Sequence, residues 1–168
     1  MSPRAAWRLD SLGFTRVYDY IAGKMDWLAF GLPSEGTDAG RLRAVNVLRA
    51  DVPRCALDEP MGAVKARVDG LDWDICCVVN ETGVLLGLLR GRAWDAPAEQ
   101  RVQQVMSEGP STIRPSEYLD EVTGRMQKGD VTALTVTDSE GHLIGLLRRE
   151  DAEQVLSRTG TDRGDIPS

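Results

Sequence analysis

The sequence predicts an α+β fold made of two copies of one β-α-β-β-α unit, preceded by a short helical and extended segment. Three observations support this fold class. Two parts of the chain match at a constant separation, each part contains apolar residues at helical spacing, and each ends in two apolar runs joined by a turn that ends in glycine. A chain of 168 residues with 42% hydrophobic residues is large enough for two such small units.

The duplication is visible as an ungapped match. Val78–Arg90 reads VVNETGVLLGLLR and Val136–Arg148 reads VTDSEGHLIGLLR, with 7 of 13 positions identical at an offset of 58 residues. Upstream, apolar character is kept at each matched pair. These pairs are Met61 with Leu119, Val64 with Val122, and Val68 with Met126. A match at a fixed offset indicates duplication of one supersecondary unit.

Each copy is expected to contain an extended stretch, a helix and a hairpin of two strands. The expected extended stretches and strands are 54–57, 75–79, 84–89, 112–115, 133–137 and 142–147. The apolar residues between the first two stretches recur at i, i+3 and i+7, which places them on one helical face. Polar turns that end at Gly83 and Gly141 favour hairpins. The second copy ends in an expected helix at 149–157, and the first ends less clearly near 92–96.

The second copy opens with Val105-Met106-Ser107, has an extended stretch ending at Pro115, and ends as VTDSEGHLIGLLRREDA. This pattern resembles the CBS domain, named after cystathionine β-synthase. The first copy is included because it matches the second, so the resemblance covers roughly 44–158. Because CBS units occur in pairs, the resemblance implies two units in a pseudo-twofold pair with a regulatory, non-catalytic role.

The N-terminal 36 residues differ in character and resemble the last third of a rhodanese domain. The residues that carry this resemblance are Ala5, Leu9, Gly13, Phe14, Val17, Gly23, Trp27, Gly31, Leu32 and Pro33. The sulfur-carrying cysteine of that family would precede them, but no cysteine precedes Cys55. We therefore expect no sulfurtransferase activity. The segment is either a vestige packed on the CBS pair or the tail of a longer product that starts at an internal Met, and the sequence leaves both open.

The expected organisation is a rhodanese-like fragment, a linker, two CBS repeats and a disordered tail. These segments are 1–36, 37–43, 44–96, 103–158 and 159–168, respectively.

The CBS resemblance implies an adenine nucleotide, of the AMP or ATP type, bound in the cleft between the repeats. The candidate binding residues are Thr112, Ile113, Ala133, Leu134, Arg148 and Asp151. Asp151 is the expected acceptor for the ribose hydroxyls, whereas the matching position of the first copy is Ala93, so one site per chain is expected. Arg148 stands where the family has Thr or Ser, and it either contacts phosphate or faces solvent at the strand end. No catalytic or metal-binding residues are expected.

Composition narrows the class of protein. A net charge of −6 disfavours a nucleic-acid partner, and no apolar run reaches the roughly 20 residues needed to span a membrane. Three irregularly spaced cysteines and one histidine disfavour a structural zinc site or a Cys–His catalytic pair. A reducing cytoplasm is the simplest compartment. A structural interaction module without ligand, or a degenerate sulfurtransferase partner, remains an alternative.

A homodimer is expected because CBS-like pairs expose apolar helix faces, and exposed apolar patches mark interfaces. The candidate interface residues are Val102, Val105, Met106, Val122 and Met126.

Overall fold

The computed structural model describes residues 3–17, 27, 32, 35–36 and 40–162. The helices α1, α3, α4 and α5 span Pro3–Ser11, Met61–Val68, Leu119–Lys128 and Arg149–Asp162. The strands β1 to β7 span Arg54–Cys55, Cys76–Val79, Leu85–Leu89, Ser107–Glu108, Thr112–Ile113, Ala133–Thr137 and Leu143–Arg148. The 3-10 turns η1, η2 and η3 span Ala44–Asn46, Gly91–Asp95 and Val102–Gln104.

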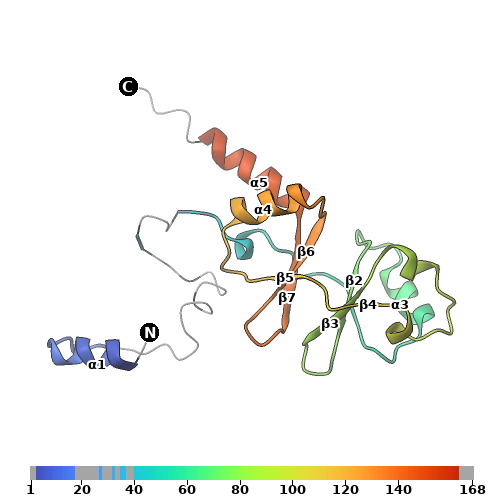
Figure 1. Ribbon diagram of the computed structural model, residues 1–168, viewed down its shortest axis with the longest axis horizontal. Coiled ribbons are helices and arrows are strands. Elements are labelled where there is room, and N and C mark those ends of the chain that lie inside the picture. Colours follow the sequence, from blue (N-terminus) through green and yellow to red (C-terminus); the bar gives the residue numbers. More distant parts are fainter. Residues whose placement is uncertain (1–2, 18–26, 28–31, 33–34, 37–39, 163–168) are drawn as a thin grey trace.

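The described strands form two sheets, one for each copy of the repeat. The first sheet has the order β1-β2-β3-β4 and the second has the order β5-β6-β7. In both sheets the short first strand runs parallel to the second, and the second and third form an antiparallel hairpin. The hairpins β2–β3 and β6–β7 lie side by side in the middle of the molecule (Figure 1). The predicted α+β fold of two matching units is confirmed.

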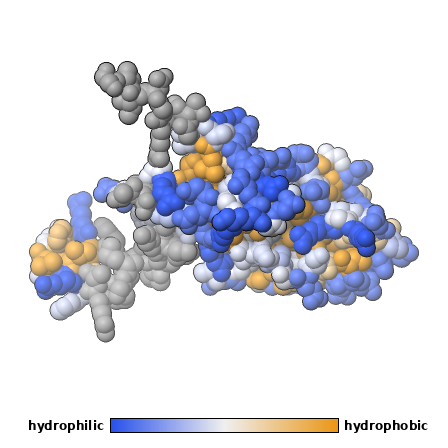
Figure 2. Space-filling model, turned by 45° about the horizontal axis from the view of Figure 1, so that its top comes forward, coloured by the Kyte–Doolittle hydropathy of each residue, from blue (hydrophilic) through white to orange (hydrophobic). Residues whose placement is uncertain are grey.

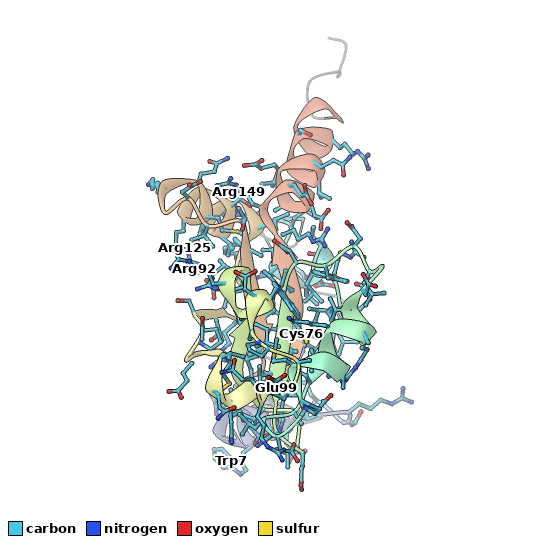
Figure 3. All side chains as sticks on the ribbon, turned by 90° about the vertical axis from the view of Figure 1, so that its right-hand side faces the viewer. Trp7, Cys76, Arg92, Glu99, Arg125 and Arg149 are labelled. Carbon is cyan, nitrogen blue, oxygen red and sulfur yellow. The ribbon has the colours of Figure 1, made fainter. Side chains whose placement is uncertain are left out.

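Each repeat has its own aliphatic core beneath its helix. Met61, Val64 and Val68 of α3 are all buried, as their helical spacing predicts. The matched residues of α4 are equally buried in the second repeat. Neighbouring strand residues point to opposite faces of a sheet, so Cys76 packs inside the first repeat (Figure 3) while Cys77 packs between the two sheets.

A third core cluster joins the two sheets. Its buried members are Val52, Trp73, Ile75, Cys77, Leu88, Leu143 and Leu146. The turns of the two hairpins also pair with each other: Val84 forms an antiparallel bridge with His142, and Leu143 donates its N–H to the carbonyl of Gly83 at 3.0 Å. The two repeats therefore form one body through both apolar packing and backbone hydrogen bonds.

The segment that precedes each repeat packs on the other repeat. Ala44 of η1 is fully buried in the core of the second repeat, and Arg49 pairs with Leu146 at the edge of β7. Val102 of η3 is fully buried in the core of the first repeat, and Ser107 pairs with Leu88. The two segments are thus exchanged between the repeats. Because Ala44 and Val102, like Arg49 and Ser107, are 58 residues apart, this exchange of segments follows the same pseudo-twofold relation as the repeats.

The exchange also satisfies the first N–H groups of both main helices. The N–H of Leu119 reaches the carbonyl of Leu42 at 2.9 Å, and the N–H of Met61 reaches the carbonyl of Gln100 at 2.8 Å. Helix starts leave such donors without intrahelical partners. Backbone carbonyls of the preceding segment therefore cap these helices by accepting N–H groups that a side-chain cap would otherwise accept.

The N-terminal helix α1 ends where its glycine predicts. Gly13 has φ +91, and the N–H of Phe14 reaches back to the carbonyl of Leu9 at 3.3 Å, a pattern typical of helix ends. α1 lies apart from the repeats and exposes apolar atoms (Figures 1 and 2), with Trp7 70% and Phe14 58% exposed. Of the expected second helical stretch, only Trp27 lies inside the described residues.

Two expectations need correction. Of the proposed interface residues, Val102, Val122 and Met126 are buried within the chain, because their apolar faces build the cores of the repeats; Val105 and Met106 remain partly exposed. α5 continues to Asp162, so positions 159–162 are helical and the rest of the expected tail lies outside the described residues. Helical bonding simply continues there, and the Thr159 hydroxyl donates to the carbonyl of Val155 at 2.9 Å.

Among the described residues, no helix is long and apolar enough to cross a membrane.

Candidate functional site: a cleft between the repeats

A cleft of about 450 Å³ opens where the loop before β2 faces the ends of β6 and β7. The first repeat contributes Leu71, Asp72, Trp73, Asp74 and Ile75. The second repeat contributes Thr132, Ala133, Leu146, Arg148 and Glu150. The cleft therefore depends on both repeats, as the CBS resemblance implied.

The structure brings two of the six predicted binding residues together in this lining. Ala133 and Arg148 are directly paired across β6 and β7. Ile113 is buried in the core of the second repeat, and Leu134 packs against the same core. Thr112 lies exposed on β5. The side chains of Ile113 and Leu134 thus help shape the repeat that carries the cleft rather than line it.

Asp151, in the first turn of α5, has an unusual carboxylate. Its Oδ2 atom is buried, and in the described part of the chain it is the one buried side-chain polar atom without a hydrogen-bond partner. A buried oxygen without a partner is costly unless a donor reaches it. The two hydroxyl groups of a ribose are donors of the required kind.

Arg148 does not lie free in solvent, because both of its terminal nitrogens have acceptors in the first repeat. Its side chain is 16% exposed, and its guanidinium lies over the Trp73 ring at 4.1 Å from the centroid. Nη1 donates to the Asp72 carboxylate at 3.1 Å, and Nη2 donates to the Asp72 carbonyl. The loop of the first repeat therefore holds the arginine of the second.

Arg49, on the exchanged segment, covers the same tryptophan. Its guanidinium is 4.7 Å from the Trp73 centroid and donates two hydrogen bonds to Asp51, at 3.1 and 2.6 Å. These bonds lower the pKa of Asp51, against a smaller opposing effect of burial. They also raise the pKa of Arg49, to which the charges of Asp151 and Asp72 add.

Sequence reasoning missed Arg49, Asp72 and Trp73. One feature indicates the loop between α3 and β2, which contains Asp72 and Trp73. When the repeats are aligned at their offset, α3 ends two residues earlier than α4, so the first repeat has the longer connection to its second strand. A large aromatic side chain in that connection, in a chain with only 5% aromatic residues, is a further signal. The contacts to Arg49 could not be read from the sequence, because they require the exchange of segments.

The matching region of the first repeat is built differently. Arg90 is exposed, and Ala93 packs against the core of its own repeat. The neighbouring Trp94 donates its indole N–H to the carbonyl of Asp74 at 2.8 Å. No carboxylate takes the place that Asp151 has in the second repeat, so the two ends of the pair are chemically unequal.

The cysteines have none of the features of a reactive thiol. All three are free and buried. A hydrogen bond with Cys76 and burial raise the pKa of Cys55, and burial raises the pKa of Cys77 to about 12. Neutral buried thiols are poor nucleophiles, so these residues pack.

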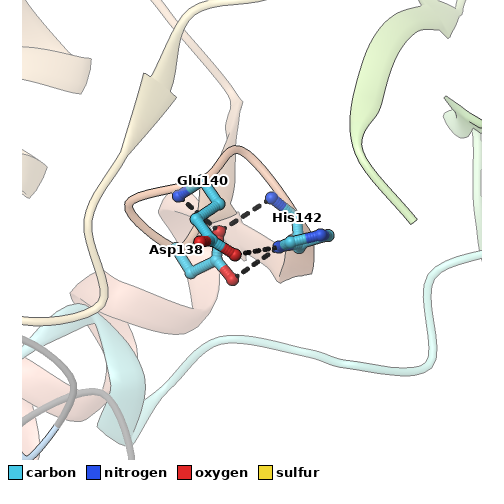
Figure 4. Close-up of side chains that lie close together, drawn as sticks. All are labelled: Asp138, Glu140 and His142. Atoms are coloured by element: carbon cyan, nitrogen blue, oxygen red, sulfur yellow. Dashed lines mark hydrogen bonds and ion pairs between the residues drawn. The ribbon is translucent and has the colours of Figure 1, made fainter. Parts of the chain in front are cut away.

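A cluster of three possible metal-binding side chains lies in the β6–β7 turn (Figure 4). Asp138, Glu140 and His142 offer donor atoms within 4.8 Å of one another. Asp138 accepts the N–H groups of Glu140 and His142 at 2.9 and 2.8 Å and contacts the His142 ring at 2.9 Å. In the first repeat, Asn80 accepts the matching N–H groups with an amide oxygen. The position therefore needs an acceptor for the turn, and these contacts account for the cluster.

Comparison with known proteins finds a family match in the second repeat. Residues 102–158 match the model of the CBS domain family. The L-aspartate semialdehyde sulfurtransferase of Methanosarcina acetivorans is 32% identical over 87 residues. That match covers 48% of this chain but only 17% of the relative, so the chain spans a small part of that enzyme.

Solved structures match across both repeats. The cytosolic domain of the magnesium channel MgtE, in complex with ATP, has a TM-score of 0.62 at 25% identity; the match covers 67% of this chain and 48% of that one. A CBS domain pair in complex with 5′-methylthioadenosine and S-adenosyl-L-methionine has a TM-score of 0.60 at 16% identity; the match covers 71% of this chain and 98% of that one.

Proposed function

We propose that the two repeats, whose fold is that of a CBS domain pair, form a regulatory module that binds one adenosine-containing ligand between them. The Asp151 carboxylate carries this proposal. Its buried oxygen has no hydrogen-bond partner, and the residue follows Glu150, which lines the cleft together with residues of both repeats; ribose hydroxyls would complete its hydrogen bonding. Similar pairs in complex with ATP, or with 5′-methylthioadenosine and S-adenosyl-L-methionine, support an adenine-containing ligand.

Binding at this position has a route to regulation. The lining comes from both repeats, so a ligand that fits one relative orientation better than another would shift the pair toward it. The regulated partner would then respond to the relative orientation of the repeats. No step of this scheme makes or breaks a covalent bond in the ligand, and we propose a non-catalytic role.

The test is a thermal-shift and calorimetric screen of the purified chain with adenosine, AMP, ATP, NADH and S-adenosylmethionine. At least one should raise the melting temperature, because a ligand that binds only the folded state stabilises it. Asp151→Ala should weaken that ligand about tenfold to hundredfold, the equivalent of roughly 1.5–3 kcal/mol for charge-assisted hydrogen bonds.

Glu153→Ala is the matched control, because it removes an exposed carboxylate from the same helix two residues away. It should bind as the parent does. If none of the five compounds binds, the module has no adenosine-type ligand and acts as a structural interaction domain. If Asp151→Ala binds as tightly as the parent, the ligand lies elsewhere.

The N-terminal residues are proposed to be the tail of a rhodanese-like domain, without sulfurtransferase activity of their own. The helix end at Gly13 fits that pattern, and buried thiols offer no sulfur carrier. Free cysteines fit the reducing cytoplasm that we propose as the compartment. We also propose a homodimer, with Val105 and Met106 as the part of the expected face that stays partly exposed.

A further inference from the structure

We propose that Asp72 is a specificity-determining residue of the cleft: its carboxylate pairs with Arg148, lies near Arg49, and thereby selects adenosyl ligands without a polyphosphate. This inference rests on the proposed function. It concerns which adenosine compounds the cleft accepts, and it reverses the expectation that Arg148 binds phosphate.

Both terminal nitrogens of Arg148 are already engaged by the first repeat. One nitrogen is bound to the Asp72 carboxylate and another to the Asp72 carbonyl, and Glu150 lies 3.5 Å from Nη1. One face of its guanidinium is covered by Trp73. A phosphate would have to displace a carboxylate that already matches the geometry and charge of the guanidinium.

Arg49 is occupied in the same way. Asp51 accepts two hydrogen bonds from it, and the Asp72 carboxylate lies 3.8 Å from its Nη1. Asp72 thus touches both of the cations that flank Trp73.

Carboxylates outnumber guanidinium groups among the charged residues that line the cleft or pair with its arginines. The guanidinium groups of Arg49 and Arg148 compare with five carboxylates, namely Asp51, Asp72, Asp74, Glu150 and Asp151. A field of this sign repels the triphosphate of ATP and favours ligands whose 5′ substituent is neutral or cationic, such as 5′-methylthioadenosine or S-adenosylmethionine. The indole of Trp73 and the methyl of Ala133 provide the apolar surface that such a substituent or the base requires.

The chain contains a matched control position. Asp130 is the counterpart of Asp72 at the repeat offset, but it pairs with Arg149 at 3.3 Å on α5 instead of with the cleft arginines. Both carboxylates are largely solvent-exposed, at 85% and 94%. Neutralising either one removes the same charge, and only Asp72→Asn removes the carboxylate charge that lies against Arg148 and Arg49.

The experiment measures the affinities of adenosine, S-adenosylmethionine and ATP for the parent chain, Asp72→Asn and Asp130→Asn by isothermal titration calorimetry. EDTA is present so that no divalent cation bridges carboxylate and phosphate. In the parent, both non-phosphorylated ligands should bind at least about tenfold more tightly than ATP. Asp72→Asn should reduce that preference about tenfold by raising ATP affinity, and Asp130→Asn should leave it unchanged.

The outcomes separate this inference from the proposed function. If the parent binds ATP as tightly as adenosine, or if Asp72→Asn keeps the parent's preference, the role of Asp72 is refuted while ligand binding stands. Equal effects of Asp72→Asn and Asp130→Asn would attribute the change to net charge and also refute it. If no adenosine compound binds the parent, the proposed function fails, and this inference fails with it.

Discussion

Gly145→Ala tests the exchange of segments that builds the cleft. Gly145 lies in β7, where the exchanged segment of the first repeat crosses it. A Cβ atom at this position would lie 2.5 Å from the carbonyl oxygen of Arg49 and 2.7 Å from Cδ1 of Leu48, whereas ordinary contacts are 3.4–4 Å. The leucine tip can rotate away, but the carbonyl belongs to the backbone.

The cost can be worked from these contacts. Relieving the overlap moves Arg49 away from Leu146, and two hydrogen bonds join these residues, at 2.8 and 2.9 Å. Overpacking costs about 1–3 kcal/mol, and each lost hydrogen bond costs about 0.5–1.5 kcal/mol. We therefore expect a loss of about 2–6 kcal/mol in the free energy of unfolding. That is a large share of the roughly 5–15 kcal/mol typical of a domain.

Urea denaturation followed by far-UV circular dichroism measures this loss. Gly124→Ala is the control: nothing lies within 4 Å of its added Cβ in α4, so it should gain up to about 1 kcal/mol from helix propensity. Gly87→Ala, at the pseudo-twofold position, meets the carbonyl of Ser107 at 2.8 Å and should also destabilise. A Gly145→Ala chain within about 0.5 kcal/mol of the parent would refute the crossing of segments.

Three further predictions concern acid stability, chemistry and assembly. Partial burial favours the neutral form of Asp138, but hydrogen bonds from His142 and Glu140 outweigh it and lower the pKa of this carboxyl. The ionised Asp138 therefore stabilises the fold above its unfolded pKa of about 3.9, and this stabilisation is lost as the pH falls through the lower folded pKa. In urea titrations, the stability difference between the parent and Asp138→Asn should shrink below about pH 4. A stability difference that does not depend on pH contradicts this. Because its thiols are buried, the chain should transfer no sulfur from thiosulfate to cyanide, and turnover abolished by Cys55→Ser would overturn that. Sedimentation should give twice the chain mass of 18.4 kDa, and only monomer at micromolar concentration would exclude the proposed homodimer.

The sequence predicted the elements that local patterns control. The buried faces of α3 and α4 follow from helical spacing, and the hairpin turns follow from Gly83 and Gly141, which have φ +88 and +89. The offset of the repeats also predicted the unequal ends, since Asp151 faces Ala93 in the alignment. These features depend on residues close together in the chain or on the repeat itself.

The remaining features depend on contacts between distant residues. The burial of Val122 and Met126 was attributed to a partner, although the core of their own repeat uses that apolar face. The contacts of Arg148 could not be predicted because its partners, Asp72 and Trp73, lie in the other repeat. The sequence pattern within one repeat cannot show which side chains a loop of the other repeat places against that repeat.

The stoichiometry of binding tests whether the cleft of the second repeat is a single ligand site that depends on Asp151. Isothermal titration of the parent chain with the best ligand of the screen should give one site per chain, because Asp151 supplies the ribose acceptor in one repeat and Ala93 offers none in the other. The same titration of Asp151→Ala should show binding weakened about tenfold to hundredfold. Two equivalent sites per chain, or one site that does not respond to Asp151→Ala, would contradict the account.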